Sequence, residues 1–296
     1  MSDRFLDPRY LMESATLVAE IGIMALAMNY VITAGHIDLS VSANMVLCAC
    51  LTAKMLQAGV PPIVALPLCL VLGTLLGVFN GVLITKLNTP SFLVTVGTMA
   101  VYRGIAQAYL GPNSVKFPEN LTGIDTQTFI GLTVPLLILV VLAVISGLVF
   151  SNTVFGRWVT AVGSNSRAAL YSAVPVHKVT ISVFAIAGFA SGLAALLLSS
   201  RLGVVRHDLL PGSELDVITI VVVGGTAIRG GDVNVLGTVL AFVTLAFMRT
   251  AMGVANYPAE NQLIAIGILL IFAVIINRLS FKTNPLRFLK KSGSIQ

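Results

Sequence analysis

Long apolar runs dominate this 296-residue sequence and restrict its possible folds more than any motif does. An α-helix needs about 20 apolar residues to cross the hydrocarbon core of a bilayer. Nine runs approach that length, at residues 14–34, 40–58, 63–85, 91–110, 131–150, 179–200, 213–228, 234–252 and 260–278. They are continuous, whereas the strands of a membrane barrel are short and alternate in polarity. The sequence therefore predicts an all-α polytopic membrane protein with about nine transmembrane helices.

The composition agrees with a chain that lies mostly in lipid. Only 10% of its residues are charged, while 56% are hydrophobic. Soluble domains contain about 25% charged residues, so this chain has too few to cover a water-facing surface. We expect one transmembrane domain over residues 1–296, in contact with the lipid bilayer throughout. The run at 213–228 is short and ends in glycines, so we expect a partial or broken span there.

Two basic segments orient the chain in the membrane. One is the loop at about residues 155–178 and the other is the tail at 278–296, and neither contains an acid. Short loops rich in Lys and Arg stay on the cytoplasmic side. Four predicted crossings separate the two segments, so both fit on that side. The net charge of +6 then reflects contact with acidic lipid headgroups and predicts no nucleic-acid partner.

The same count assigns a side to the other loops. Residues 111–130 and 201–211 fall outside, the latter despite Arg201 and Arg206, whose charge Asp208 offsets in part. The N-terminus also falls outside, which is awkward for the charged residues in 1–9. We therefore expect either that the topology starts differently or that an earlier helix, before the first apolar run, is missing.

The loop at 155–178 is predicted to contain a short helix. Ala168, Ala169 and Leu170 follow a Ser/Asn cluster, and such clusters are typical of capped helix N-termini. A short helix on the cytoplasmic side is a natural docking surface for a soluble partner. A plain connecting loop is the alternative.

Three glycines predict a close helix contact. Gly73, Gly77 and Gly81 are four residues apart, so they share one face of the helix predicted at 63–85. Small residues on one face let two membrane helices approach closely.

Several polar residues interrupt the apolar runs. Asp38, in the segment Gly35–Ser40, either lies near a pathway, as membrane ionisable groups often do, or helps to cap the helix that follows. Glu214 and Asp216 open the run at 213, where acids also suit the first helical turn. Arg103 and Arg249 either face a polar cavity or extend to an interface.

The remaining candidate motifs predict no catalytic chemistry. Gly224–Gly231 lacks the Lys-Ser/Thr pair of a phosphate-binding loop and is read as a turn between helices. The three cysteines, Cys48, Cys50 and Cys69, fall inside apolar runs and are read as core residues. The three histidines are scattered singly, so neither a metal site nor a hydrolytic triad is expected.

Four motifs in order resemble the permease subunits of bacterial ABC importers for monosaccharides, the ribose-permease-like family. They are Gly35–Ser40 (GHIDLS), Thr89–Thr98 (TPSFLVTVGT), Ala161–Asn165 (AVGSN) with Ala168–Ala169, and Glu214–Asp216 (ELD) followed by Gly224–Thr226 and Gly230–Gly231. The likeness covers residues 4–278. It implies a type II ABC-importer-like bundle of ten helices, one more than the nine predicted here, in the bacterial inner membrane.

The resemblance also implies partners and functional segments. The partners are ATP-binding subunits, a second permease that is either identical or different, and a periplasmic sugar-binding protein. The region Gly163–Pro175 would be the helix that couples to the ATPase, and we assign to this coupling loop Arg157, Gly163, Asn165, Arg167, Ala168, Ala169 and Pro175. The residues expected near the translocation path are Asp38, Ser40, Asn44, Arg103, Glu214 and Asp216. No Walker motif is present, so ATP and Mg²⁺ would bind the partner, with no cofactor on this chain.

Two departures from the family pattern are visible. His36 replaces the second glycine of Gly-Gly-Ile-Asp-Leu-Ser, and members of the family begin with one more helix before a Phe-Leu-x-Pro stretch, seen here as Phe5–Pro8. The segment Ala168–Pro175 is most similar to permeases for less common sugars, rhamnose-like, or for autoinducer-2.

Two other classes of protein remain as rivals. A secondary transporter or facilitator would work alone and would use membrane acids such as Asp38, Glu20 or Glu260. A membrane-embedded enzyme would need a nucleophile, base or metal constellation, and the sequence shows none.

Overall fold

The structure is a computed structural model that describes residues 8–282. Residues 1–7 and residues 283–296, which include most of the basic tail, lie outside the described residues. The helices are α1 (Pro8–Thr16), α2 (Ala19–Thr33), α3 (Val41–Gln57), α4 (Pro62–Leu87), α5 (Ser91–Leu110), α6 (Val134–Asn152), α7 (Val154–Ser164), α8 (Ser166–Tyr171), α9 (Val176–Leu202), α10 (Ser213–Val223), α11 (Val235–Val254) and α12 (Ala259–Lys282). Short elements lie in the loops: β1 (Val115–Lys116), η2 (Glu119–Leu121), η3 (Ile124–Thr126), β2 (Thr128–Phe129), β3 (Leu132–Thr133) and β4 (Val204–Val205).

Every predicted crossing coincides with a helix, which confirms the all-α polytopic fold. Five helices are long and apolar enough to span a membrane, namely α4, α6, α9, α11 and residues Glu260–Asn277 of α12. The predicted run at 14–34 is instead divided between α1 and α2, which are bent by 60° and make a sixth span if they count as one. α5 has 20 residues, but Thr95, Thr98, Arg103 and Gln107 make it less apolar than these helices.

Two helices are short for membrane crossings. α10 has 11 residues and a length of about 16 Å, which is roughly half of the ~30 Å hydrocarbon core. α3 has 17 residues. The partial span predicted at 213–228 is therefore a half-length helix, and its polar N-terminal residues begin inside the bundle rather than at the surface.

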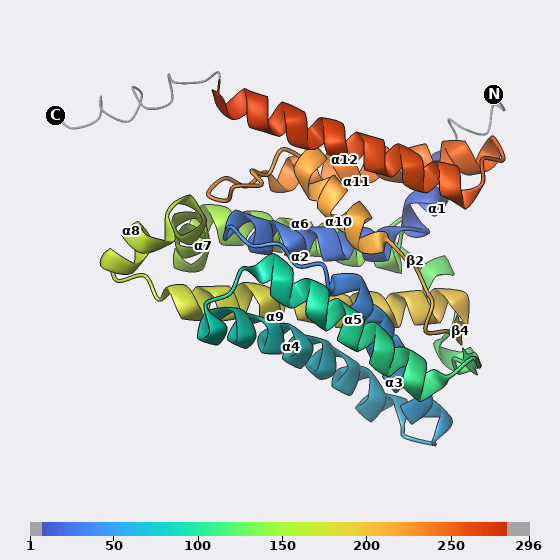
Figure 1. The fold of residues 1–296 in the computed structure, drawn as a ribbon. Coiled ribbons are helices and arrows are strands. Elements are labelled where there is room, and N and C mark those ends of the chain that lie inside the picture. The colour runs from blue at the N-terminus through green and yellow to red at the C-terminus, as the bar shows by residue number, and fades with distance from the viewer. Residues whose placement is uncertain (1–7, 283–296) are drawn as a thin grey trace.

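The loops gather at two ends, as the charge pattern predicts. β1 pairs with β4, with Val115 opposite Val205, so the loops predicted to lie outside meet at one end. At the other end an added Cβ on Gly163 would meet the backbone of Thr33 and Gly231, so the α2–α3, α7–α8 and α10–α11 connections meet there. Figure 1 shows α7 and α8 at this second end, opposite β2 and β4. We call it the cytoplasmic end, after the side that the charge pattern predicts for it.

α2 forms the centre of the bundle. All of its residues from Ala19 to Thr33 are buried, and it packs against α6, α9, α10 and α11. A helix that is apolar all round belongs inside a bundle. Its position explains why this run shows no amphipathic face.

α4 and α9 form the most extensive helix pair, and glycines make it possible. A Cβ added to Gly77 would lie 2.1 Å from the carbonyl oxygen of Phe184, and one added to Gly73 would lie 2.5 Å from that of Gly188. The same holds in reverse, because a Cβ on Gly188 would lie 2.2 Å from the carbonyl oxygen of Gly73. The close contact predicted for Gly73, Gly77 and Gly81 is confirmed. We call this contact the glycine seam.

The glycine seam predicts a large difference between two Gly→Ala substitutions. Gly77→Ala places a methyl group against a backbone carbonyl that cannot turn aside, so we expect it to lower the free energy of unfolding by about 1–3 kcal/mol. Gly97→Ala on α5 meets nothing within 4 Å, and alanine favours a helix over glycine by about 1 kcal/mol. Thermal unfolding of the purified chain in one detergent should show a lower midpoint for the first variant only. Equal midpoints would contradict the seam.

Candidate functional site

The segment between α2 and α3 holds Asp38 in a local turn. The side chain is 2% exposed, and its Oδ1 accepts hydrogen bonds from Ser40 N at 2.8 Å and from Ser40 Oγ at 2.7 Å. Asp commonly forms such a turn by binding its own backbone two residues ahead. Asn80 of α4 donates to Ser40 Oγ at 2.7 Å. This contact is local, but it is not the helix cap that the sequence suggested, because Ser40 is the N-cap residue of α3 and no side chain forms a capping hydrogen bond there.

Asn44 lies one turn beyond Ser40, on α3, and like Ser40 it forms a hydrogen bond with α4. Its Nδ2 donates to the carbonyl oxygen of Gly73 at 3.1 Å, and Tyr102 of α5 donates to the carbonyl oxygen of Leu76 at 3.0 Å. These bonds fasten α3 and α5 to the helix that forms the glycine seam. Sequence reasoning did not single out Asn80 or Tyr102, although an amide within the apolar run at 63–85 was a visible signal.

Arg103, Glu214 and Ser42 meet in the middle of the bundle. Arg103 Nη2 lies 3.4 Å from Glu214 Oε2 and donates to Ser42 Oγ at 3.3 Å, while the Ser42 hydroxyl donates to Glu214. Arg103 is twelve residues beyond the start of α5, which places it about 18 Å from that cytoplasmic end. The sequence analysis identified Arg103 and Glu214 as separate candidates, and the structure brings them together. Ser42 was missed.

This pair is partly exposed. The Arg103 and Glu214 side chains are 27% and 13% exposed, respectively. A charge that faces hydrocarbon at this depth is costly, and such residues normally face a bundle interior or a water-filled cavity. The exposed face of this pair therefore suits water or another protein better than lipid. We call Arg103, Glu214 and Ser42 the mid-membrane cluster.

Two other ion pairs have buried carboxylates. Arg249 of α11 pairs with Asp216 of α10, and Arg201 at the end of α9 pairs with Glu20 of α2. Both acid side chains are only 2% exposed. Asp216 is two residues from Glu214, so the two acids leave α10 on different sides. The structure thus places Asp216 in a helix–helix contact apart from the mid-membrane cluster.

The Arg201 pair also explains an exception to the positive-inside pattern. Arg201 lies at the outer end of α9, and Glu20 offsets its charge within the bundle. Arg206 likewise forms two hydrogen bonds with Asp208, at 2.8 and 2.6 Å. Arg201 and Arg206, the two arginines of the predicted outer loop at 201–211, therefore both have acidic partners.

The predicted short helix is α8, and it projects at the cytoplasmic end (Figure 1). The Asn165 side chain accepts from Ala168 N at 3.0 Å, which identifies the cap within the Ser/Asn cluster. Leu170 and Tyr171 are 57% and 90% exposed, whereas Ala169 is buried. Arg157 and Arg167 are also exposed, and Pro175 precedes α9. α8 therefore presents the apolar side chains of Leu170 and Tyr171 outward, as a docking helix does.

Gly163 joins this region to the body of the protein. A Cβ on it would lie 1.7 Å from the carbonyl oxygen of Thr33, and Gly231 N donates to that same oxygen at 2.9 Å. Gly230 and Gly231 have φ values of +84° and +88°, which glycine adopts without strain. The turn predicted for Gly224–Gly231 is confirmed. We call the contact of Gly163 with Gly35, Gly230 and Gly231 the glycine joint.

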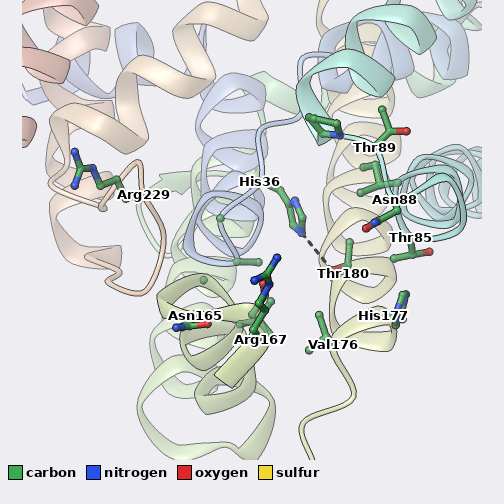
Figure 2. A pocket seen from close by; sticks show the side chains of 17 residues that line it. His36, Thr85, Asn88, Thr89, Asn165, Arg167, Val176, His177, Thr180 and Arg229 are labelled. Atoms are coloured by element: carbon green, nitrogen blue, oxygen red, sulfur yellow. Dashed lines mark hydrogen bonds between the residues drawn. The ribbon is translucent and has the colours of Figure 1, made fainter. Parts of the chain in front are cut away.

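A cavity of about 670 Å³ opens beside the glycine joint. Figure 2 shows residues from α4, α8 and α9 and from the α2–α3 connection around it. His36 Nε2 lies 3.2 Å from Thr180 Oγ1, and burial lowers the pKa of His36 to about 4. The ring is therefore neutral at physiological pH. His36 is the residue that replaces a glycine of the family motif.

Comparison with known proteins agrees with this geometry. Residues 10–274 match the family described as "Branched-chain amino acid transport system / permease component". The chain belongs to this permease family. The match covers all the described helices except the beginning of α1 and the end of α12.

Individual relatives are similar over most of their length. The permease is 36% identical over 281 residues to the autoinducer 2 import system permease protein LsrD of Yersinia enterocolitica, covering 93% of this chain and 85% of the relative. It is 33% identical over 287 residues to the ribose import permease protein RbsC of Bacillus subtilis, covering 94% and 87%. It is also 33% identical over 258 residues to RbsC of Haemophilus influenzae, covering 86% and 80%. No solved structure matches the chain.

The neutral state of His36 predicts a pH-dependent stability. Its pKa of about 4 in the folded permease lies below the ordinary value of about 6.5, so between these values the unfolded chain binds more protons. Stability is therefore complete above about pH 6.5 and decreases as the pH falls toward 4. We expect His36→Gln to lose this contribution to the slope. Thermal midpoints of both proteins from pH 7.5 to 4.5 test this, and parallel curves would contradict it.

Proposed function

We propose that this permease is the membrane-spanning subunit of an ATP-driven importer for a monosaccharide or sugar-like solute. The observation that supports ATP coupling is α8, an exposed helix that presents Leu170 and Tyr171 at the cytoplasmic end. A carrier that works alone has no need of such a helix. The substrate class follows from the relatives, which are named as import permeases for ribose and for autoinducer 2.

The proposal assigns the chemistry to partners. ATP and Mg²⁺ would bind a separate ATP-binding subunit, which docks on the coupling loop through α8. A second copy or a different permease would complete the path, and a periplasmic sugar-binding protein would deliver the solute at the outer end. The assembly would lie in the bacterial inner membrane. ATP binding would move α8, and the path would open to alternate sides.

Within this proposal the mid-membrane cluster lines the path. Arg103 and Glu214 are partly exposed at a depth where lipid contact is costly, so water and the second permease would cover this face. Carboxylate, guanidinium and hydroxyl groups can exchange hydrogen bonds with sugar hydroxyls. Asp38, Ser40 and Asn44 would act behind the cluster by holding α3, and Asp216 by holding α10 against α11.

The alternative is a secondary transporter whose membrane acids bind a coupling ion. Glu20 pairs with Arg201, and both contacts of Asp38 Oδ1 are with Ser40. Acids held in this way are poor candidates for alternating protonation, so the geometry favours the importer.

Docking on α8 can be tested by co-purification in detergent with the candidate ATP-binding subunit. Tyr171→Asp, alone and with Ala168→Asp, should abolish co-purification, because both positions are exposed on α8 and a carboxylate opposes an apolar contact. Ala169→Asp is unsuitable, because Ala169 is buried. Tyr257→Asp is the matched control, since Tyr257 is 53% exposed near the opposite end. Retention of the ATPase by the α8 variants would exclude this docking site.

The role of the mid-membrane cluster can be separated from folding. Single substitutions Arg103→Gln or Glu214→Gln leave one charge without its partner, so we expect lower thermal midpoints. The double substitution Arg103→Gln/Glu214→Gln removes both charges and should restore much of the midpoint, but uptake into proteoliposomes containing the full transporter should remain at least tenfold lower. Asp208→Asn, in an exposed pair at the outer end, is the control. Normal uptake by the double variant would make the cluster purely structural.

A further inference from the structure

The cavity beside the glycine joint is lined mainly by polar and basic groups. Seventeen residues surround its volume of about 670 Å³, a size typical of small-molecule sites. The described residues that line it include two arginines and two histidines but no aspartate or glutamate. It lies at the cytoplasmic end, apart from the mid-membrane cluster. The proposed import cycle does not use it.

Its cations differ in orientation. Figure 2 shows the Arg167 side chain extending from α8 toward His36, while the Arg229 side chain points away. Within the described residues the four ion pairs include neither arginine. Arg167 is therefore a cation directed at the cavity with its planar set of N–H donors available, which suits a phosphate group.

Polar side chains lie on the other walls, and the hydroxyl oxygens of Thr85 and Thr89, which donate to the carbonyl oxygens of Gly81 and Leu87, remain as hydrogen-bond acceptors. Thr85 comes from the last turn of α4, Asn88 and Thr89 come from the α4–α5 connection, and Thr180 and His177 come from the first turns of α9 (Figure 2). Asn88, with φ of +48°, ends α4, and α9 begins at Val176. The N-terminal end of a helix adds backbone N–H groups and a partial positive charge. Hydroxyl and amide groups opposite a guanidinium match a ligand with one anionic end and several hydroxyls.

We propose that this cavity binds a phosphorylated sugar from the cytoplasm. The imported solute is neutral in the proposed function, and a phosphoryl-transfer reaction that consumes it produces an anion that the bilayer retains. A ligand here would contact α8 and the start of α9 together. Its affinity would therefore depend on the position of α8, the proposed coupling helix. The effect of the ligand on the coupling helix rests on the proposed function. Binding of the phosphorylated sugar does not, because it requires only the permease.

Binding can be measured with the purified full-length chain in neutral detergent by titration calorimetry with ribose 5-phosphate. We expect saturable binding that Arg167→Gln weakens about tenfold, because one charge-assisted contact is lost. Arg167→Lys should recover part of the affinity. Arg157→Gln is the matched control, since it removes an exposed arginine of the same loop outside the cavity lining. His36→Gly, which restores the family residue, should also weaken binding.

Four outcomes would overturn the proposal. Equal affinities of Arg157→Gln and Arg167→Gln would place the anion elsewhere, and equal affinity for ribose would remove the need for phosphate. Inorganic phosphate that binds as tightly as the ester would exclude the sugar. Loss of ester binding in nanodiscs of phosphatidylglycerol, but not of phosphatidylcholine, would assign the site to a lipid headgroup. None of these results depends on import, so failure here is distinguishable from failure of the proposed function.

Discussion

The contact between the backbones of α4 and α9 is the constraint on which the other features depend. Lipid offers helices no hydrophobic reason to associate, so close van der Waals packing must hold them, and the glycine seam provides it. Because α4 is fixed against α9, the bonds from Asn44 and Tyr102 to α4 carbonyls also fix α3 and α5. The seam therefore determines where Arg103 of α5 lies, and with it the position of the mid-membrane cluster.

The charges inside the bundle divide according to exposure. The acids that pair with Arg201 and Arg249 are almost fully buried, and each pair joins two helices that already pack together. The pair of Arg103 and Glu214 differs, because it reaches the surface at mid-depth. The short length of α10 makes this possible, since it starts the helix within the membrane and leaves Glu214 there. A full-length helix would have placed that acid at the outer interface.

Much of this arrangement could be predicted from the sequence, and the rest could not for physical reasons. The helices follow from apolar length, the glycine seam from the spacing of Gly73, Gly77 and Gly81, and the two ends from the cationic loops. The partner of Arg103 could not be predicted, because 111 residues separate it from Glu214 and either acid near residue 215 was eligible. The break between α1 and α2 has no glycine or proline to mark it, so the apolar run alone predicts one continuous helix there.

α8, the proposed coupling helix, is held by very short connections. One residue, Asn165, separates α8 from α7, and the other connection contains Ala173 at φ +60°, a conformation that a residue with a side chain rarely adopts. α7 is fixed to α2 by the glycine joint, and α9 is fixed to α4 by the glycine seam. α8 therefore cannot move without changing the distance between these two anchored helices or straining the connections. The cavity lies in the space between them, so the proposed ligand would oppose the displacement of α8 that the proposed ATP-driven cycle requires.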